Sequence, residues 1–138
     1  MTPRFTAFRF APHWLAWAFA LPMALTAHAA KPADMLADLT QQAGAPAQAA
    51  RGQAFFTARH GKEWSCSTCH GATPTQPGKH ASTGKAIGAL APAANAERFT
   101  DPAKTEKWFR RNCNDVVGRE CGAGEKADLL AWLITLKP

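Results

Sequence analysis

The chain has 138 residues, of which 16 are Lys or Arg, 10 are Asp or Glu, four are Cys and five are His. This length accommodates one domain and excludes a barrel enzyme or a full dinucleotide-binding domain. A hydrophobic fraction of 46% and a charged fraction of 19% are typical of a globular protein. They exclude a disordered chain and a protein with many membrane spans.

Residues 1–29 have the pattern of a secretory signal peptide. Two arginines supply a positive start, an apolar run covers residues 14–25, and a Thr-Ala-His-Ala segment ends at Ala29 with Ala at both small-residue positions of a cleavage site. A membrane anchor is the alternative, but the run is shorter than the ~20 residues that a span needs. We therefore expect export to the periplasm, cleavage near Ala29/Ala30, and a mature domain over residues 30–138 that does not span a membrane.

Four helices are predicted in the mature domain, and no segment alternates between apolar and polar residues as a strand does. The first covers residues 31–44 and is broken by Gly44-Ala45-Pro46, and the second covers about 47–59 and is stopped by Gly61. An Asp-Pro pair suits the start of a third helix over about 101–113. The last helix, over about 125–136, has apolar residues at positions i, i+3, i+4 and i+7. The mature domain is therefore predicted to be all-α.

Residues 71–100 are rich in Gly, Pro, Ala and Thr and show little periodicity. A connection of this length without secondary structure is uncommon in a compact domain. Four short helices also bury only a modest apolar surface. A large apolar cofactor, with this segment wrapped around it, would account for both features.

Cys66, Cys69 and His70 have the C-x-x-C-H spacing of a c-type haem attachment site. Two thiols three residues apart reach the two vinyl groups at one edge of a porphyrin, and the next imidazole reaches the iron. We predict one covalently bound haem c, with His70 as the proximal iron ligand.

Three other interpretations of this cluster are weaker. A thioredoxin-like redox pair needs a βαβ setting, and none is visible. A zinc site needs a second ligand pair, and Cys113 and Cys121 are eight residues apart, a poor match to the usual spacing. A Cys66–Cys69 disulfide would leave His70 without a role.

The helices resemble those of small class I cytochromes c, in which an N-terminal helix crosses a C-terminal one through a glycine and an aromatic residue. Here the contact would join Gly52 and either Phe55 or Phe56 to Trp132. Gly52 inside a helix costs about 1 kcal/mol relative to Ala. A close approach of the two helices would offset this cost, although ordinary core packing is compatible with the same residues.

The second axial ligand is not the methionine usual in that class, because no Met follows Met35. The remaining candidates are His80, His60, Lys85, Asn112 or an open site. His60 is expected to be a solvated residue at a helix end, and Lys85 would have to lose its proton. Asn112 shares a helix face with Trp108, which we expect to point inward, but an Asn near a helix end can also be a cap.

Cys113 and Cys121 form the second cysteine pair. In an oxidising compartment we expect them to form a disulfide. The closed loop is short, so the stabilisation expected from chain entropy is roughly 2–3 kcal/mol. Free thiols and a second metal site are the alternatives.

Basic residues gather in the third predicted helix, and they are Lys104, Lys107, Arg110 and Arg111. Three of them, Lys104, Lys107 and Arg111, are expected to form a cationic face separate from Trp108. Without the two arginines of the leader the net charge is +4. The cluster suits docking to an acidic redox partner or pairing with haem propionates, or it is a solvated face. No nucleic-acid-binding motif is present.

Several blocks carry a more specific resemblance. They are residues 64–66, 83–87, 90–92, 98–101, 107–113 and 118–121. Over about residues 47–137 the sequence resembles the sphaeroides-haem-protein (SHP) type of monohaem cytochrome c. The resemblance implies a class I cytochrome c-like fold, with four to five short helices around one haem. It also implies that Asn112 is the distal ligand in the oxidised state and that a Cys113–Cys121 disulfide lies beside it.

The same resemblance implies a function. On reduction the asparagine leaves, and the iron then binds small diatomic gases such as O2, NO or CO, with a dihaem cytochrome c as the electron donor. The main departure from the family pattern lies at residues 122–124, Gly-Ala-Gly, where the weak cap should loosen the start of the last helix. Two alternatives stay open: a haem enzyme that consumes O2, NO or peroxide, and a plain electron carrier that uses His80 as its sixth ligand.

Overall fold

The computed structural model describes Met1 and residues 30–138, so the segment expected to be a signal peptide otherwise lies outside the described residues. Five helices and two short strands are present: α1 (Pro32–Ala43), α2 (Ala49–Thr57), α3 (Cys66–His70), β1 (Gly78–Lys79), β2 (Ala86–Ile87), α4 (Pro102–Val116) and α5 (Ala123–Thr135). This mainly helical architecture confirms the predicted all-α class. The antiparallel β1–β2 pair was not predicted, because strands of two residues are too short to show alternation.

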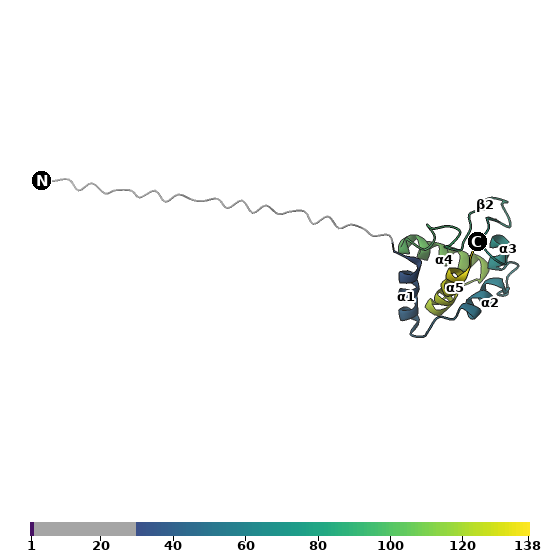
Figure 1. The fold of residues 1–138 in the computed structure, drawn as a ribbon, viewed down its shortest axis with the longest axis horizontal. Helices are drawn as coiled ribbons and strands as arrows, with labels where there is room; N and C mark the ends of the chain where they lie inside the picture. Colours follow the sequence, from purple (N-terminus) through teal and green to yellow (C-terminus); the bar gives the residue numbers. More distant parts are fainter. Residues whose placement is uncertain (2–29) are drawn as a thin grey trace.

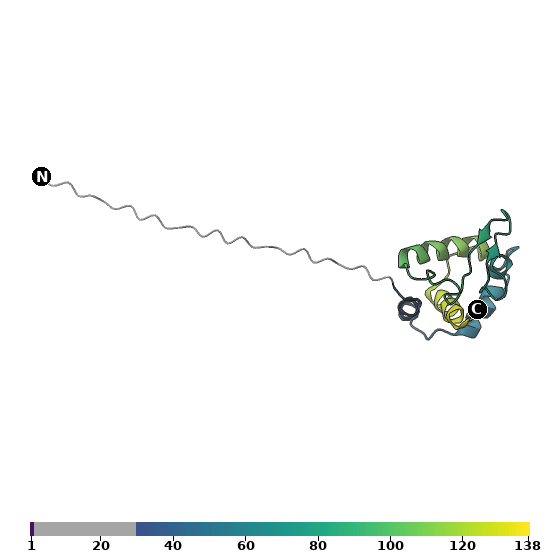
Figure 2. The same ribbon diagram turned by 45° about the horizontal axis from the view of Figure 1, so that its top comes forward.

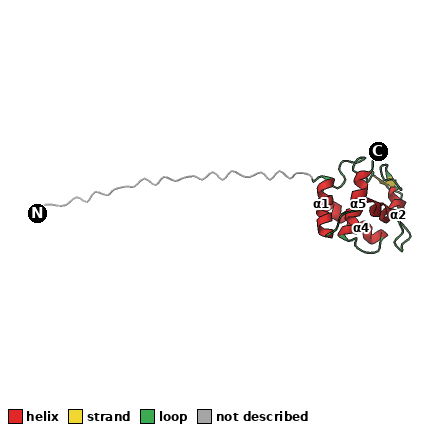
Figure 3. Cartoon of the chain, turned by 60° about the horizontal axis from the view of Figure 1, so that its bottom comes forward, coloured by secondary structure: helices red, strands yellow, loops and turns green. Residues whose placement is uncertain are grey.

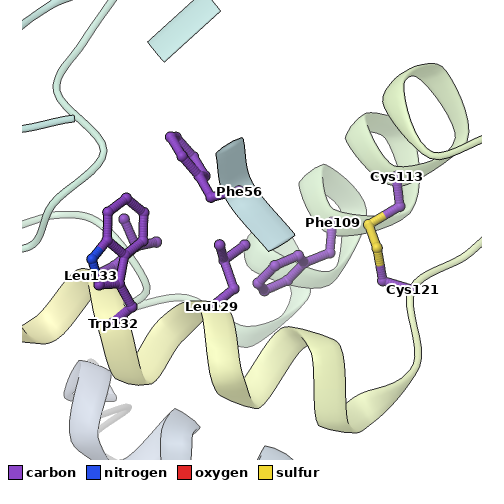
Figure 4. Packing of buried hydrophobic residues seen from close by; sticks show 7 residues of the cluster. All are labelled: Phe56, Phe109, Cys113, Cys121, Leu129, Trp132 and Leu133. Atoms are coloured by element: carbon purple, nitrogen blue, oxygen red, sulfur yellow. A yellow bond between two sulfur atoms is a disulfide. The ribbon is translucent and has the colours of Figure 1, made fainter. Parts of the chain in front are cut away.

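The α5 helix lies at the centre of the domain, between α1 on one side and α2 on the other (Figures 1 and 3). Met35 and Leu39 of α1 pack with Ala127 and Leu130 of α5 in one buried cluster. A second cluster joins α2, α4 and α5 (Figure 4). Its buried members are Phe56, Phe109, Cys113, Cys121, Leu129, Trp132 and Leu133.

The crossing of α2 and α5 depends on Gly52. A β-carbon at this position would overlap the backbone carbonyl of Asp128 and would lie 2.7 Å from the backbone nitrogen of Leu129. Beside this contact, the rings of Phe56 and Trp132 lie 4.9 Å apart, centre to centre. The predicted close crossing is therefore confirmed, with Phe56 as the aromatic partner of Trp132 and with the α5 backbone, rather than Trp132, against Gly52.

The buried carboxylate of Asp128 fastens the same two helices. It accepts hydrogen bonds from Arg51 Nε at 2.6 Å, Arg51 Nη2 at 2.9 Å and the backbone N–H of Gln48 at 2.6 Å. The hydrogen bonds from Arg51 lower the pKa of Asp128, and this effect outweighs burial, which would raise it. A buried charge with this many donors is fully compensated.

Both helices that flank the disulfide have side-chain caps. The Asp101 carboxylate accepts the backbone N–H of Lys104 at 2.9 Å and begins α4, as predicted. At α5, Glu125 accepts the backbone N–H of Gly122 at 2.9 Å, and Arg119 holds Glu125 with a 2.6 Å hydrogen bond. The expectation of a loose start to the last helix was therefore wrong, because Glu125 supplies the cap that residues 122–124 lack.

The α4 helix packs over α5 near the disulfide and makes few close backbone contacts with the other helices described (Figure 2). Phe109 and Cys113 anchor it to the buried cluster, and Lys126 of α5 reaches Glu106 at 2.7 Å. In the part of the chain that the structure describes, no helix is both long enough and apolar enough to cross a membrane.

Candidate functional site

A cavity of about 1030 Å³ opens between α4 and the rest of the domain. Residues of α2, α3, the β1–β2 hairpin, the segment 88–99, α4 and α5 line it. Its volume is at the upper end of the ~300–1,000 Å³ range of ligand pockets in proteins. The predicted site residues that line it are Cys66, Cys69, His70, His80, Lys85, Asn112 and Cys113. Tertiary folding thus brings the attachment motif and the α4 asparagine to one space.

The attachment motif forms the short helix α3, which Ser65 and Thr68 cap reciprocally. The backbone N–H of Ser65 donates to Thr68 Oγ1 at 3.0 Å, and the N–H of Thr68 donates to the Ser65 carbonyl at 3.1 Å. Residues three apart on a helix lie on one side, so both thiols are presented to the cavity. Cys66 and Cys69 are free and half-buried, and burial raises the pKa of Cys66 to about 11, which keeps it a neutral thiol.

His70 is half-buried at the end of α3 and lines the cavity. Burial, and secondarily the positive charge of Arg98, lowers its pKa, so the imidazole is neutral near pH 7. A neutral imidazole has the free electron pair that a metal ligand requires. The chemistry of His70 therefore fits its predicted role.

Gly78 of β1 supports the attachment helix from outside. A β-carbon on Gly78 would overlap the Cys69 carbonyl and would lie 3.0 Å from the α-carbon of His70. This contact was missed at the sequence level, because nothing local to residue 78 shows that β1 crosses α3. The position of Arg98 in the cavity lining was also missed, because the sequence showed Arg98 only as part of the family-like block 98–101.

The cavity wall formed by α4 carries Lys104, Trp108 and Asn112, one helical turn apart. Trp108 lines the cavity, so this face of the helix points inward as predicted, although 42% of the Trp108 surface is accessible. Arg111 also lines the cavity, with its guanidinium 5.5 Å from the centre of the Trp108 ring. The prediction that the cationic face is separate from Trp108 was therefore wrong.

Asn112 lies inside α4, which continues to Val116, so its side chain is not at a helix end. Among the residues that the structure describes, no hydrogen bond involves the side-chain carboxamide of Asn112. Its neighbour Cys113 is bonded to Cys121, as predicted, with the α-carbons 5.8 Å apart. The disulfide ties the α4 turn that carries Asn112 to the segment before α5 (Figure 4).

Two histidines were weighed as alternative iron ligands. His80 lines the cavity, but its Nδ1 accepts the backbone N–H of Thr83 at 3.3 Å. Ser82 Oγ lies 3.2 Å from the same nitrogen, so the His80 ring is hydrogen-bonded within its own turn and would have to leave these contacts to bind a metal through Nδ1. His60 is half-buried against Phe55, with ring centres 4.3 Å apart and Nε2 2.8 Å from the Phe55 carbonyl. His60 is therefore a packed residue outside the cavity lining, and the expectation that it is solvated was wrong.

The residues around the cavity fit a haem. Two free thiols and a neutral imidazole lie on α3, and aromatic and aliphatic side chains from three helices and a loop cover the walls. These apolar residues include Phe55, Phe56, Leu90, Phe99, Leu129 and Leu133. Among the described residues, no group of three or more His, Cys, Asp or Glu side chains is placed to hold a metal ion, so the zinc interpretation has no ligand set there.

Comparisons with known proteins show which family this chain is similar to. Residues 42–133 match the family described as "Domain of unknown function (DUF1924)". The cytochrome c-type protein SHP of Cereibacter sphaeroides is 56% identical over 106 residues, which cover 74% of this chain and 81% of that protein. Cytochrome c'' of Methylophilus methylotrophus is 43% identical over 88 residues, 61% of each chain.

Solved structures show the same fold. A structure described as oxidized SHP, an oxygen-binding cytochrome c, matches with a TM-score of 0.71 and 54% identity, covering 75% of this chain and 96% of that one. The crystal structure of oxidized cytochrome c'' matches with a TM-score of 0.70 and 34% identity, covering 78% and 95%. The identity and coverage show that this chain belongs to the SHP family of c-type cytochromes, with a class I cytochrome c-like fold.

Proposed function

We propose that this chain is a periplasmic monohaem cytochrome c that transfers electrons and binds small diatomic gases only when it is reduced. In this proposal Cys66 and Cys69 hold one haem through thioether bonds, His70 is the proximal ligand, and Asn112 is a displaceable distal ligand. The observation that carries it is the shared cavity, which the free thiols, the neutral imidazole and the Asn112 amide all line.

A haem held there by Cys66, Cys69 and His70 would supply an iron that can be reduced and reoxidised and that can bind a small diatomic ligand. Asn112 offers a neutral amide oxygen, a hard and weak donor that ferric iron holds better than ferrous iron. Asn112 therefore binds in the oxidised protein and leaves in the reduced one. The disulfide beside it limits how far this turn of α4 moves when the amide leaves.

The relatives support this proposal by what they are described to do. The SHP structure is described as that of an oxygen-binding cytochrome c. A solution structure of cytochrome c'', with a TM-score of 0.69 and 34% identity, is described as giving insight into haem-ligand detachment. In this chain, detachment of Asn112 would be the event that allows a gas to bind.

Absorption spectra test the distal ligand. The ferric, dithionite-reduced and CO-treated spectra of the holoprotein are compared with those of Asn112→Ala and of Asn114→Ala, a matched control on α4 that does not line the cavity. We expect a high-spin ferrous spectrum that shifts at once with CO in all three proteins, and an altered ferric spectrum only in Asn112→Ala. An unchanged ferric spectrum in Asn112→Ala would refute the role of Asn112.

The second candidate is an electron carrier with two histidine ligands, because His80 lines the same cavity. The hydrogen bond from Thr83 to its Nδ1 weighs against it. His80→Ala separates the two proposals. If His80 is the sixth ligand, the parent protein has sharp low-spin bands that are indifferent to CO, and His80→Ala removes them.

We also propose that an acidic redox partner, such as a dihaem cytochrome c, docks on the exposed part of α4. Lys107 and Arg110 are exposed there and do not line the cavity, so their charges are free for a partner. Charges at such a rim act mainly on the rate of association. Stopped-flow reduction by the partner should slow steeply with ionic strength, and charge reversal at Lys107 and Arg110 should slow it at low salt.

A further inference from the structure

The Arg98 guanidinium is a half-buried cation on the cavity wall. Its Nε donates to the Ala89 carbonyl at 2.9 Å, and its Nη2 donates to the Gly88 carbonyl at 2.9 Å. These two bonds hold the planar group in one orientation. Since a guanidinium has five N–H donors, three N–H groups have no partner among the described residues.

No carboxylate neutralises this charge. Among the described residues, the ion pairs involve Arg51, Arg111, Arg119 and Lys126, and none involves Arg98. Glu97 and Asp101 line the same cavity without pairing with it. A half-buried cation that no described carboxylate pairs with is suited to bind an anion that enters the cavity.

The backbone beside Arg98 is held in a strained conformation. Phe99 has φ = 61°, and it is the one described non-glycine residue with positive φ. For a bulky residue this left-handed conformation costs roughly 1–2 kcal/mol, and such residues gather at functional sites. Phe99 lines the cavity and packs against both buried clusters. The packing of Phe99 against both clusters maintains this conformation and holds the segment that carries Arg98 at the cavity wall.

We infer that Arg98 is the site that receives a haem propionate, with its free N–H groups donating to the carboxylate. This inference rests on the proposed haem site, and it assigns the carboxylate end of the cofactor to a residue for which the family-like motifs gave no role. Arg98 is then a positioning residue that also offsets the negative charge entering the cavity. A guanidinium suits this task because its fork matches the geometry of a carboxylate.

Infrared spectroscopy tests the contact directly. The holoprotein is produced with haem labelled with ¹³C at the propionate carboxyls, and redox difference spectra are recorded for the parent, Arg98→Gln, Arg98→Lys and Arg110→Gln. Arg110 is the matched control, because it is a cation on α4 that does not line the cavity. We expect the labelled carboxylate bands to shift in Arg98→Gln and, by less, in Arg98→Lys, whereas Arg110→Gln matches the parent. The reduction potential of Arg98→Gln should also become more negative, because a cation has been removed.

Unshifted labelled bands in Arg98→Gln, or an equal shift in Arg110→Gln, would overturn the inference. If Arg98→Gln yields no holoprotein, Arg98→Lys decides alone, because lysine keeps the charge but lacks the fork, and unshifted bands there overturn it too. A pyridine haemochrome assay of the parent separates this inference from the proposed function. Parent protein without covalently attached haem would refute the haem site itself.

Discussion

Replacing Gly52 with Ala should destabilise the domain, although alanine is the better helix former. The new β-carbon would overlap the Asp128 carbonyl, and its distance to the Leu129 nitrogen would have to grow from 2.7 Å to at least the 3.4 Å of ordinary contact. Both neighbours are backbone atoms of α5, so no side chain can rotate away and the helices must separate. Overpacking of this kind costs about 1–3 kcal/mol. The helix propensity of Ala returns about 1 kcal/mol, so the expected net loss is about 2 kcal/mol, since the cost here lies at the upper end.

Gly124→Ala is the matched control for this prediction. Gly124 is also helical, but the nearest atom to a β-carbon there is Ala43 Cβ at 3.8 Å, an ordinary contact. This variant should gain up to about 1 kcal/mol. Guanidinium unfolding of the ferric holoproteins, followed by far-ultraviolet circular dichroism, measures both. If Gly52→Ala is as stable as its parent while Gly124→Ala behaves as expected, the argument from close helix contact is wrong.

Three further predictions concern the acid response, the attachment helix and the disulfide. The depressed pKa of Asp128 means that its contribution is fully present above its ordinary value of 3.8 and is lost as pH falls through the lower folded value. Asp128→Asn should therefore be less stable than the parent at pH 7, by about 1–3 kcal/mol. Below pH 3.8 it should lose less stability on acidification than the parent does. Urea unfolding at several pH values measures both effects, and equal losses in the two proteins would contradict the argument. Gly78→Ala should displace α3 and lower both the thermal midpoint and the yield of attached haem, whereas Gly124→Ala, with its nearest atom at 3.8 Å and outside the cavity lining, should lower neither; equal effects would exclude the proposed contact. Replacing Cys113 and Cys121 with Ser should cost about 2–3 kcal/mol through the lost loop constraint, and an unchanged denaturation midpoint would argue against that estimate.

The predicted parts of the site depend on short sequence separations. Cys66, Cys69 and His70 are close enough in sequence for one helical turn to present them together, so their arrangement needed no tertiary information. The α4 start was predictable for the same reason, because Asp101 caps a backbone group only three residues away. The paired cysteines followed from the expected oxidising compartment.

The errors have one physical origin. The contact of Arg111 with Trp108, the packing of His60 and the cap from Glu125 each depend on how side chains and neighbouring segments are placed, and periodicity carries no information about this. The contact of Gly78 with α3 joins a two-residue strand to a helix that precedes it in the chain. Such contacts leave no pattern within a sequence window.

The sequence by itself determined the C-x-x-C-H spacing, the helical class and the absence of a methionine after Met35, because these depend on residue identity and local spacing. Only the tertiary structure decided which residues share the cavity. The packing of α5 between α1 and α2, and of α4 over α5, places Asn112 and Arg98 in the lining that also contains His70. That lining arises because helices distant in the chain bury their apolar faces together, and burial then sets the protonation of Cys66 and His70.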